Sequence, residues 1–139
     1  MSHDFHKFWL KISAIVIASF GPVAFLATMP EYSEVARFSL DVLVWPVDGQ
    51  QTYEGPTMHF VSALLGGFLF GWGVMIWCLS VWVYDAEPEG VRKSLLVGAL
   101  AWFFLDSAGS IASGAWQNAV WNILVLLMIV GPMWRPAKN

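Results

Sequence analysis

Charged side chains and cysteines are both scarce in this chain of 139 residues. Only 12% of the residues are charged, against roughly 25% in an average soluble domain, and 58% are hydrophobic. Cys78 is the single cysteine, so neither an intramolecular disulfide nor a cysteine-based zinc cage can form. The formal net charge of −3 offers no basic stripe for nucleic acid. These absences exclude the soluble, disulfide-stabilised and nucleic-acid-binding classes.

Motifs that carry common catalytic chemistry are also missing. The sequence has no His-x-x-x-His or Glu-x-x-His spacing, no Gly-rich phosphate loop ending in Lys-Ser/Thr, and no Gly-x-Ser-x-Gly elbow. A haem held by two histidines is disfavoured, because His3 and His6 precede the first apolar run and leave His59 without an intramembrane partner. We therefore expect no catalytic residues and no metal ligands, and the sequence identifies no cofactor.

Three long apolar runs predict an all-α, polytopic membrane protein with four transmembrane helices. Ile12–Met29 and Thr57–Tyr84 contain no Asp, Glu, Lys or Arg, and Ser94–Trp134 contains only Asp106. One crossing takes about 20 apolar residues, so the last run must cross twice, with its reversal at Gly114, where glycine permits a tight turn. The predicted spans, packed as a four-helix bundle in one integral membrane domain (1–139), cover residues 9–29, 57–84, 94–113 and 116–134.

The distribution of basic residues predicts the orientation of these spans. Six basic residues fall on the side of the two termini, whereas only Arg37 falls on the other side. We therefore expect a multi-pass protein of a bacterial cytoplasmic (inner) membrane with both termini cytoplasmic. The alternative for the first run is a secretory signal peptide, but that run is long and no small-x-small cleavage site follows it. The six basic residues are Lys7, Lys11, Arg92, Lys93, Arg135 and Lys138.

The external segment, residues 30–56, is predicted to hold one amphipathic interfacial helix between Pro30 and Pro46. Its charged face includes Arg37 and Asp41, which are spaced as an i,i+4 ion pair. We expect this helix to lie in the outer interface or to cap the bundle, and the functional alternative is a lid over an external pocket. Its acidic residues have no cation-site spacing and are expected to be solvated. The apolar face is predicted to comprise Val35, Phe38, Val42 and Trp45.

A polar cluster is predicted in the outward half of the last two spans. Asp106 lies eight residues before Gly114 and Asn122 eight residues after it, so both lie at the same depth, ~12 Å from the outer end. Helical spacing places Asn118 on the face of Asn122 and Ser110 on the face of Asp106. The predicted ligand-binding residues are Asp106, Ser110, Asn118 and Asn122, with His59 at the outer mouth.

Two interpretations of Asp106 remain open at this point. In the structural one, Asn and Ser side chains satisfy the carboxylate and fix the register of the hairpin, for about 1 kcal/mol each. In the functional one, Asp106 titrates or binds a ligand, as ionisable groups inside membrane spans commonly do. Joining the last two spans to each other needs only Asn and Ser side chains. No basic residue lies within any span to neutralise the Asp106 carboxylate.

The second span carries a small-x-x-x-small pattern, Gly67-x-x-x-Gly71. This pattern is typical of close helix packing, either within the chain or with a partner. The aromatic residues around it fill the bundle, face lipid, or stack on a planar cofactor, and the first two alternatives are favoured.

These observations predict a small non-enzymatic membrane protein, an accessory or ligand-binding subunit whose polar pocket opens in the outward half. The alternative is a small oligomeric transporter or proton-coupled carrier that uses Asp106, and a membrane-embedded enzyme is less favoured. The expected partners are the lipid bilayer and either a membrane-protein partner or further copies of the chain in a homo-oligomer. No nucleic-acid partner is expected.

Overall fold

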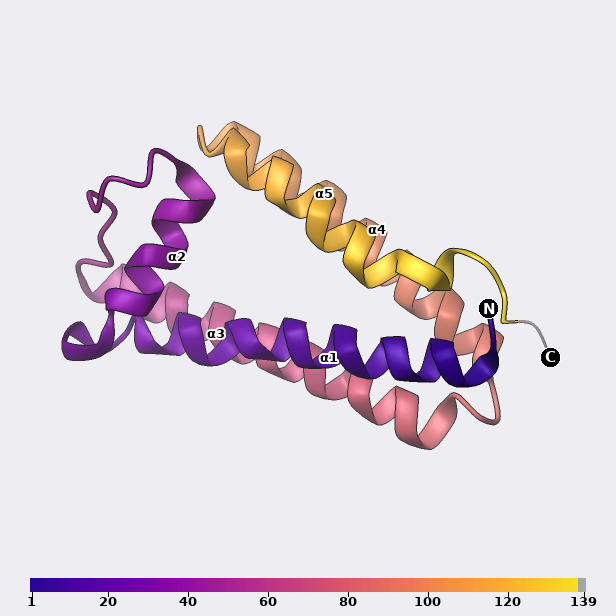
Figure 1. Ribbon diagram of the computed structural model, residues 1–139. Coiled ribbons are helices and arrows are strands. Elements are labelled where there is room, and N and C mark those ends of the chain that lie inside the picture. Colours follow the sequence, from indigo (N-terminus) through magenta and orange to yellow (C-terminus); the bar gives the residue numbers. More distant parts are fainter. Residues whose placement is uncertain (138–139) are drawn as a thin grey trace.

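The computed structural model describes residues 1–137, in which helices are joined by turns and one long loop, without strands (Figure 1). In that part of the chain four helices are long and apolar enough to cross a membrane, which confirms the all-α prediction and the number of apolar spans. Lys138, one of the basic residues used to predict orientation, lies outside the described residues. The elements are α1 (His3–Leu26), a 3-10 turn (Pro30–Tyr32), α2 (Glu34–Val44), α3 (Pro56–Cys78) extended by a π-helical turn (Leu79–Val83), α4 (Pro88–Ala112), and α5 (Trp116–Val130) extended by a 3-10 turn (Gly131–Trp134).

The ends of these helices follow from local sequence. Ser2 caps α1, because its hydroxyl oxygen accepts a hydrogen bond of 3.3 Å from the Phe5 backbone N–H. Pro56 and Pro88 begin α3 and α4, at the position where the missing N–H of proline costs no helical hydrogen bond. The predicted reversal between α4 and α5 is confirmed, since Gly114 adopts a φ of 86° there.

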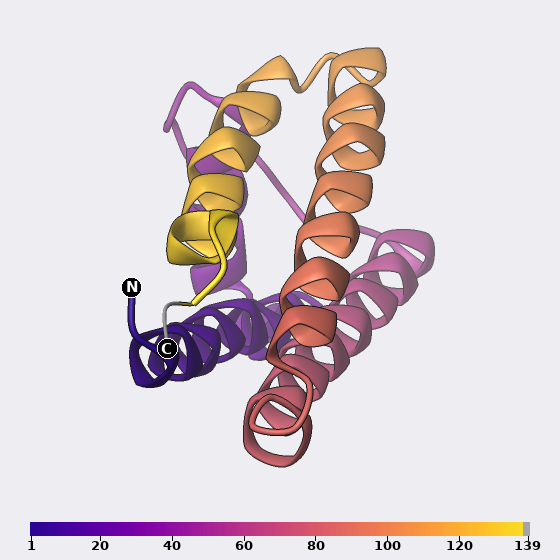
Figure 2. The same cartoon turned by 90° about the vertical axis from the view of Figure 1, so that its right-hand side faces the viewer.

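The four long helices form two antiparallel pairs, α1 with α3 and α4 with α5 (Figure 1). The pairs meet at the end that carries the N terminus, which we call the terminal end. They separate toward the opposite end, which we call the α2 end because α2 stands there between the two pairs. The view from the side shows the same divergence (Figure 2). The bundle is therefore open at one end.

An apolar core joins the two pairs at the terminal end. The Trp9 indole of α1 donates a hydrogen bond of 2.8 Å to the Met128 carbonyl of α5, which links the two pairs. Within the second pair, Arg92 of α4 donates one of 3.0 Å to the Met133 carbonyl. Farther along, the ring centroids of Trp72 on α3 and Trp102 on α4 lie 6.0 Å apart, so these two large rings lie between the helices. The buried core residues are Leu10, Ala14, Ile17, Ile76, Tyr84, Val91, Leu95, Ala99, Ile129, Val130 and Met133.

At the other end, α2 links the pairs through tryptophan contacts. The Trp121 indole donates a hydrogen bond of 2.8 Å to the Val42 carbonyl, and the Trp45 ring meets the Trp121 ring edge-on at 6.5 Å. Of the predicted apolar face, Val35 and Phe38 are exposed, whereas Ala36 is fully buried. The position of this helix in the outer interface, where exposed apolar side chains would face lipid, stays a prediction.

The predicted ion pair between Arg37 and Asp41 does not form. Arg37 instead pairs with Glu34 at 2.7 Å, one turn earlier in the helix. Asp41 is only 4% exposed and accepts hydrogen bonds from the backbone N–H groups of Gly49, at 2.8 Å, and Gln51, at 3.4 Å. Backbone donors of the loop satisfy the buried carboxylate, whereas an exposed ion pair would contribute little.

Close packing of α1 against α3 depends on Gly21, Gly66 and Gly73. A Cβ atom placed on Gly66 would lie 2.8 Å from the Gly21 carbonyl oxygen, and one on Gly73 would lie 2.6 Å from the Ala14 carbonyl oxygen. The predicted pair, Gly67 and Gly71, makes no such approach, since a Cβ on either would meet nothing within 4 Å. The helix uses small residues as membrane helices commonly do, but on a different face from the one the motif indicated.

We predict that Gly73→Ala destabilises the protein by about 1–3 kcal/mol, because the added methyl group collides with backbone atoms that cannot rotate away. The matched control, Gly71→Ala, is expected to change stability by no more than about 1 kcal/mol, and in the stabilising direction. Unfolding in detergent micelles, followed by circular dichroism, measures both. Equal stability of the two variants would contradict this packing.

The loop between α3 and α4 is tied to the start of α1 by Asp85. Its carboxylate pairs with the Lys7 ammonium and with His3, whose Nε2 lies 3.0 Å from Oδ1. The hydrogen bond from Lys7, followed by that from His3, holds the pKa of Asp85 below its usual range. Because the pKa of Asp85 is lower in the folded state, its pairing with Lys7 and His3 contributes fully to stability above the ordinary pKa of aspartate. This contribution is lost as the pH falls through the lowered pKa of the folded state.

We predict that hydrogen exchange of the backbone amides in residues 84–87 accelerates, relative to its intrinsic rate, as the pH falls below about 4. Asp85→Asn should show faster exchange at neutral pH and no such transition. Glu87→Gln is the matched control, because Glu87 makes no ion pair in residues 1–137. A transition that persists in Asp85→Asn would show that another group is responsible.

Candidate functional site

Asp106 lies on the stripe of α4 that forms the core at the terminal end. Leu95, Ala99, Trp102 and Asp106 follow one another at spacings of four, three and four residues, which places them on one helical face. The first two are buried in the core, and Trp102 meets Trp72 of α3. Asp106 is therefore the next residue on this stripe, one helical turn beyond Trp102 toward the end of α4.

Two asparagine side chains of α5 bind the Asp106 carboxylate. The Asn118 amide donates a hydrogen bond of 3.1 Å to Oδ2 of Asp106, and the Asn122 amide donates one of 2.6 Å to the same oxygen. The predicted contact between Asp106 and these asparagines is confirmed. A three-residue turn at Gly114 fixes the register of the two helices, so residues of equal depth on α4 and α5 meet.

Each asparagine amide uses its second proton on a serine hydroxyl. Asn118 donates a hydrogen bond of 2.8 Å to Ser110 Oγ, as the predicted position of Ser110 required, and Asn122 donates one of 3.1 Å to Ser107 Oγ. The predicted site omitted Ser107, which is almost fully buried. The sequence places Ser107 next to Asp106, but only the packing of α5 against α4 shows that Asn122 binds Ser107.

The second carboxylate oxygen of Asp106, Oδ1, accepts no hydrogen bond from residues 1–137. No lysine, arginine or histidine of that range pairs with the carboxylate either. The side chain is half-buried, whereas Asn122 is only 4% exposed. One oxygen is thus held by two amides, and the other remains available to a donor from outside the described chain.

His59 does not join the Asp106 cluster. Its Nε2 lies 2.9 Å from the Tyr53 carbonyl oxygen, and its side chain lines a separate pocket with residues of α2 and the long loop. Sequence depth placed His59 near the outer mouth, but the divergence of the helix pairs separates α3 from α4 there (Figure 1). Gln117, in the first turn of α5, has a buried Oε1 without a hydrogen-bond partner in the described residues.

The cluster can bind a hydrogen-bond donor or a cation, but it lacks the groups that most catalysis requires. No group of three or more His, Cys, Asp or Glu side chains is placed to hold a metal ion within residues 1–137. The asparagine amides and serine hydroxyls beside Asp106 orient it without offering a nucleophile activated by a base. No protein-family model, curated protein or solved structure matches this chain.

We predict a favourable coupling energy of about 0.5–2 kcal/mol between Asp106 and Asn122, the range found for hydrogen bonds between membrane helices. A double-mutant cycle with Asp106→Ala and Asn122→Ala, measured by unfolding in micelles, gives this value. The control cycle combines Asp106→Ala with Ser113→Ala. The Ser113 hydroxyl donates to the Ser110 carbonyl beside it in the chain, so the coupling between Asp106 and Ser113 should be near zero. Equal couplings in the two cycles would refute the contact.

Proposed function

We propose that this protein is a non-enzymatic accessory or ligand-binding subunit of a bacterial cytoplasmic membrane. Its ligand, or a segment of its partner, carries a hydrogen-bond donor or a cationic group that binds Asp106. The proposal places both termini in the cytoplasm and the Asp106 cluster in the outward half of the membrane.

The observation that carries this proposal is the unequal use of the two oxygens of Asp106. Oδ2 accepts from Asn118 and Asn122, while Oδ1 accepts from no residue in the described range. A carboxylate inside a membrane span is costly, and neutral side chains could have joined α4 to α5 at a lower cost. An acidic residue with one free oxygen is therefore better explained by binding than by helix association alone.

The remaining residues of the cluster have positioning roles in this proposal. Asn118 and Asn122 hold Oδ2, and Ser107 and Ser110 hold the two amides, so the direction of the carboxylate is fixed before a ligand arrives. Such preorganisation reduces the entropy that binding must overcome. The orphaned oxygen of Gln117 is a second acceptor on α5 that requires a donor.

Native mass spectrometry of the protein, extracted gently from its own membrane, tests the proposal. We predict that the wild type retains a small molecule or a partner subunit and that Asp106→Asn loses it, since the shape of the side chain is kept while its charge is removed. Ser113→Ala is the matched control and should retain the bound species. Circular dichroism establishes that both variants are folded.

Two results would contradict the proposal. Retention of the same species by Asp106→Asn would assign Asp106 a structural role. A wild-type protein without any bound species, present only as a homo-oligomer, would favour the carrier, which requires Asp106 to titrate during transport.

A further inference from the structure

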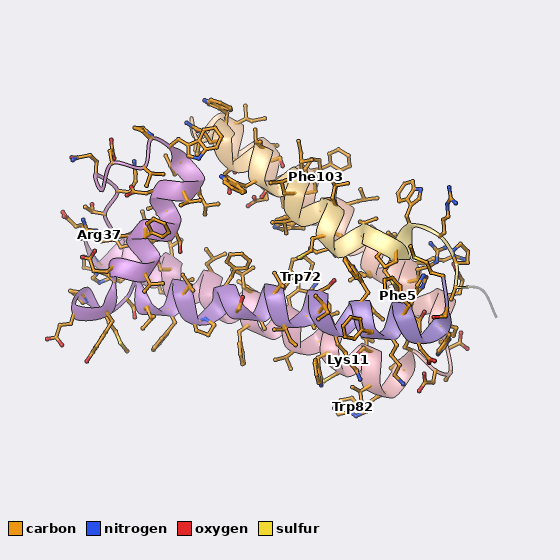
Figure 3. The ribbon with its side chains drawn as sticks, viewed as in Figure 1. Phe5, Lys11, Arg37, Trp72, Trp82 and Phe103 are labelled. Atoms are coloured by element: carbon orange, nitrogen blue, oxygen red, sulfur yellow. The ribbon has the colours of Figure 1, made fainter. Side chains whose placement is uncertain are left out.

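A polar pocket lies at the α2 end and shares no residue with the Asp106 cluster. It has a volume of about 350 Å³ and lies between the turn before α2, the first half of α2, the loop that precedes α3, and the first turn of α3. Figure 3 shows Arg37 on α2 at this end of the molecule. The polar residues that line the pocket are Ser33, Arg37, Thr52, Glu54 and His59.

The pocket holds one positive and one negative side chain that are not paired with each other. Arg37 pairs with Glu34 and donates hydrogen bonds of 3.3 Å to the carbonyl groups of Gly49 and Gln51. These bonds fix the guanidinium group and use three of its five N–H donors, so two remain for a ligand. Glu54 makes no ion pair within residues 1–137. A ligand that carries both charges would accept from the two remaining Arg37 donors and pair with Glu54.

The start of α3 also borders the pocket, directly after Glu54 in the chain. Pro56 begins α3 without a side-chain cap, so the N–H groups of the first helical turn after it have no side-chain acceptor. The start of a helix also carries a partial positive charge that favours anions. His59 holds the approaching loop in place through the Tyr53 carbonyl. The pocket therefore has backbone donors at the start of α3 in addition to the free N–H groups of Arg37.

The position of the pocket indicates the source of such a ligand. It lies where α1 has ended and α3 begins, which is one end of two candidate membrane spans. That level corresponds to the lipid head groups of one leaflet, where phosphate groups are abundant. We propose that this pocket binds a zwitterionic phosphate ester, such as a phosphoethanolamine head group, with its phosphate on Arg37 and its ammonium group on Glu54.

The proposal is independent of the role of Asp106 and is tested with defined lipids. The full chain is placed in nanodiscs that contain equal amounts of phosphatidylethanolamine and phosphatidylglycerol, and the lipids retained by the released protein are measured by native mass spectrometry. We expect the wild type to retain phosphatidylethanolamine preferentially. Glu54→Gln should reduce this preference by roughly two- to fivefold, the factor that a partly exposed ion pair supplies.

Three comparisons make this result specific. Glu31→Gln, an exposed carboxylate outside the pocket, should keep the wild-type preference. Arg37→Gln should reduce retention of both lipids, because both carry a phosphate. Since Arg37 also holds the loop, Glu54→Gln remains the decisive variant if Arg37→Gln fails to fold. A wild type without preference, or equal losses in Glu54→Gln and Glu31→Gln, would overturn the proposal.

Competition with glycerophosphoethanolamine, the deacylated head group, separates the two sources of the ligand. Failure of the soluble compound to displace the retained lipid supports a lipid site. Complete displacement at millimolar concentration would overturn the lipid assignment and support a site for soluble phosphate esters.

Discussion

A carboxylate within a helix long and apolar enough to cross a membrane needs hydrogen-bond donors, and the chain supplies them from the adjacent helix. Asn118 and Asn122 both donate to Oδ2 of Asp106. In lipid, apolar surfaces do not drive helices together as they do in water, so polar contacts of this kind decide which faces meet. The turn at Gly114 fixes the register of α4 and α5, and this interaction then sets the direction of the Asp106 side chain and leaves Oδ1 available.

The two helix pairs achieve association by different physical means. In the first pair, Gly66 and Gly73 allow the backbone of α3 to approach α1 so closely that a Cβ atom would collide with it. In the second pair, amides and hydroxyls join α4 to α5. The pairs share an apolar core only at the terminal end, and α2 bridges them at the other end through Trp121 and Val42. This arrangement separates the polar face of α4 and α5 from α1 and α3 toward the α2 end.

Much of the Asp106 cluster could be predicted from sequence, because a tight turn at Gly114 fixes the relative depth of residues on either side of it. The same reasoning failed for His59, since depth in a bilayer says nothing about lateral position once the helix pairs diverge. For the glycine motif, the sequence did not show which small residues of α3 meet α1, and packing of Gly67 and Gly71 against a partner stays a prediction. For Asp41, the loop N–H groups that bind it belong to the backbone and leave no signal in side-chain patterns.

The most direct test of the central interaction is NMR of the asparagine side-chain amides in lipid nanodiscs. The chain contains three asparagines, so selective ¹⁵N labelling gives a simple spectrum. We expect the amides of Asn118 and Asn122 to exchange slowly with solvent and both to shift in Asp106→Asn. Rapid exchange of these two amides, or shifts unchanged by Asp106→Asn, would show that they do not bind the carboxylate.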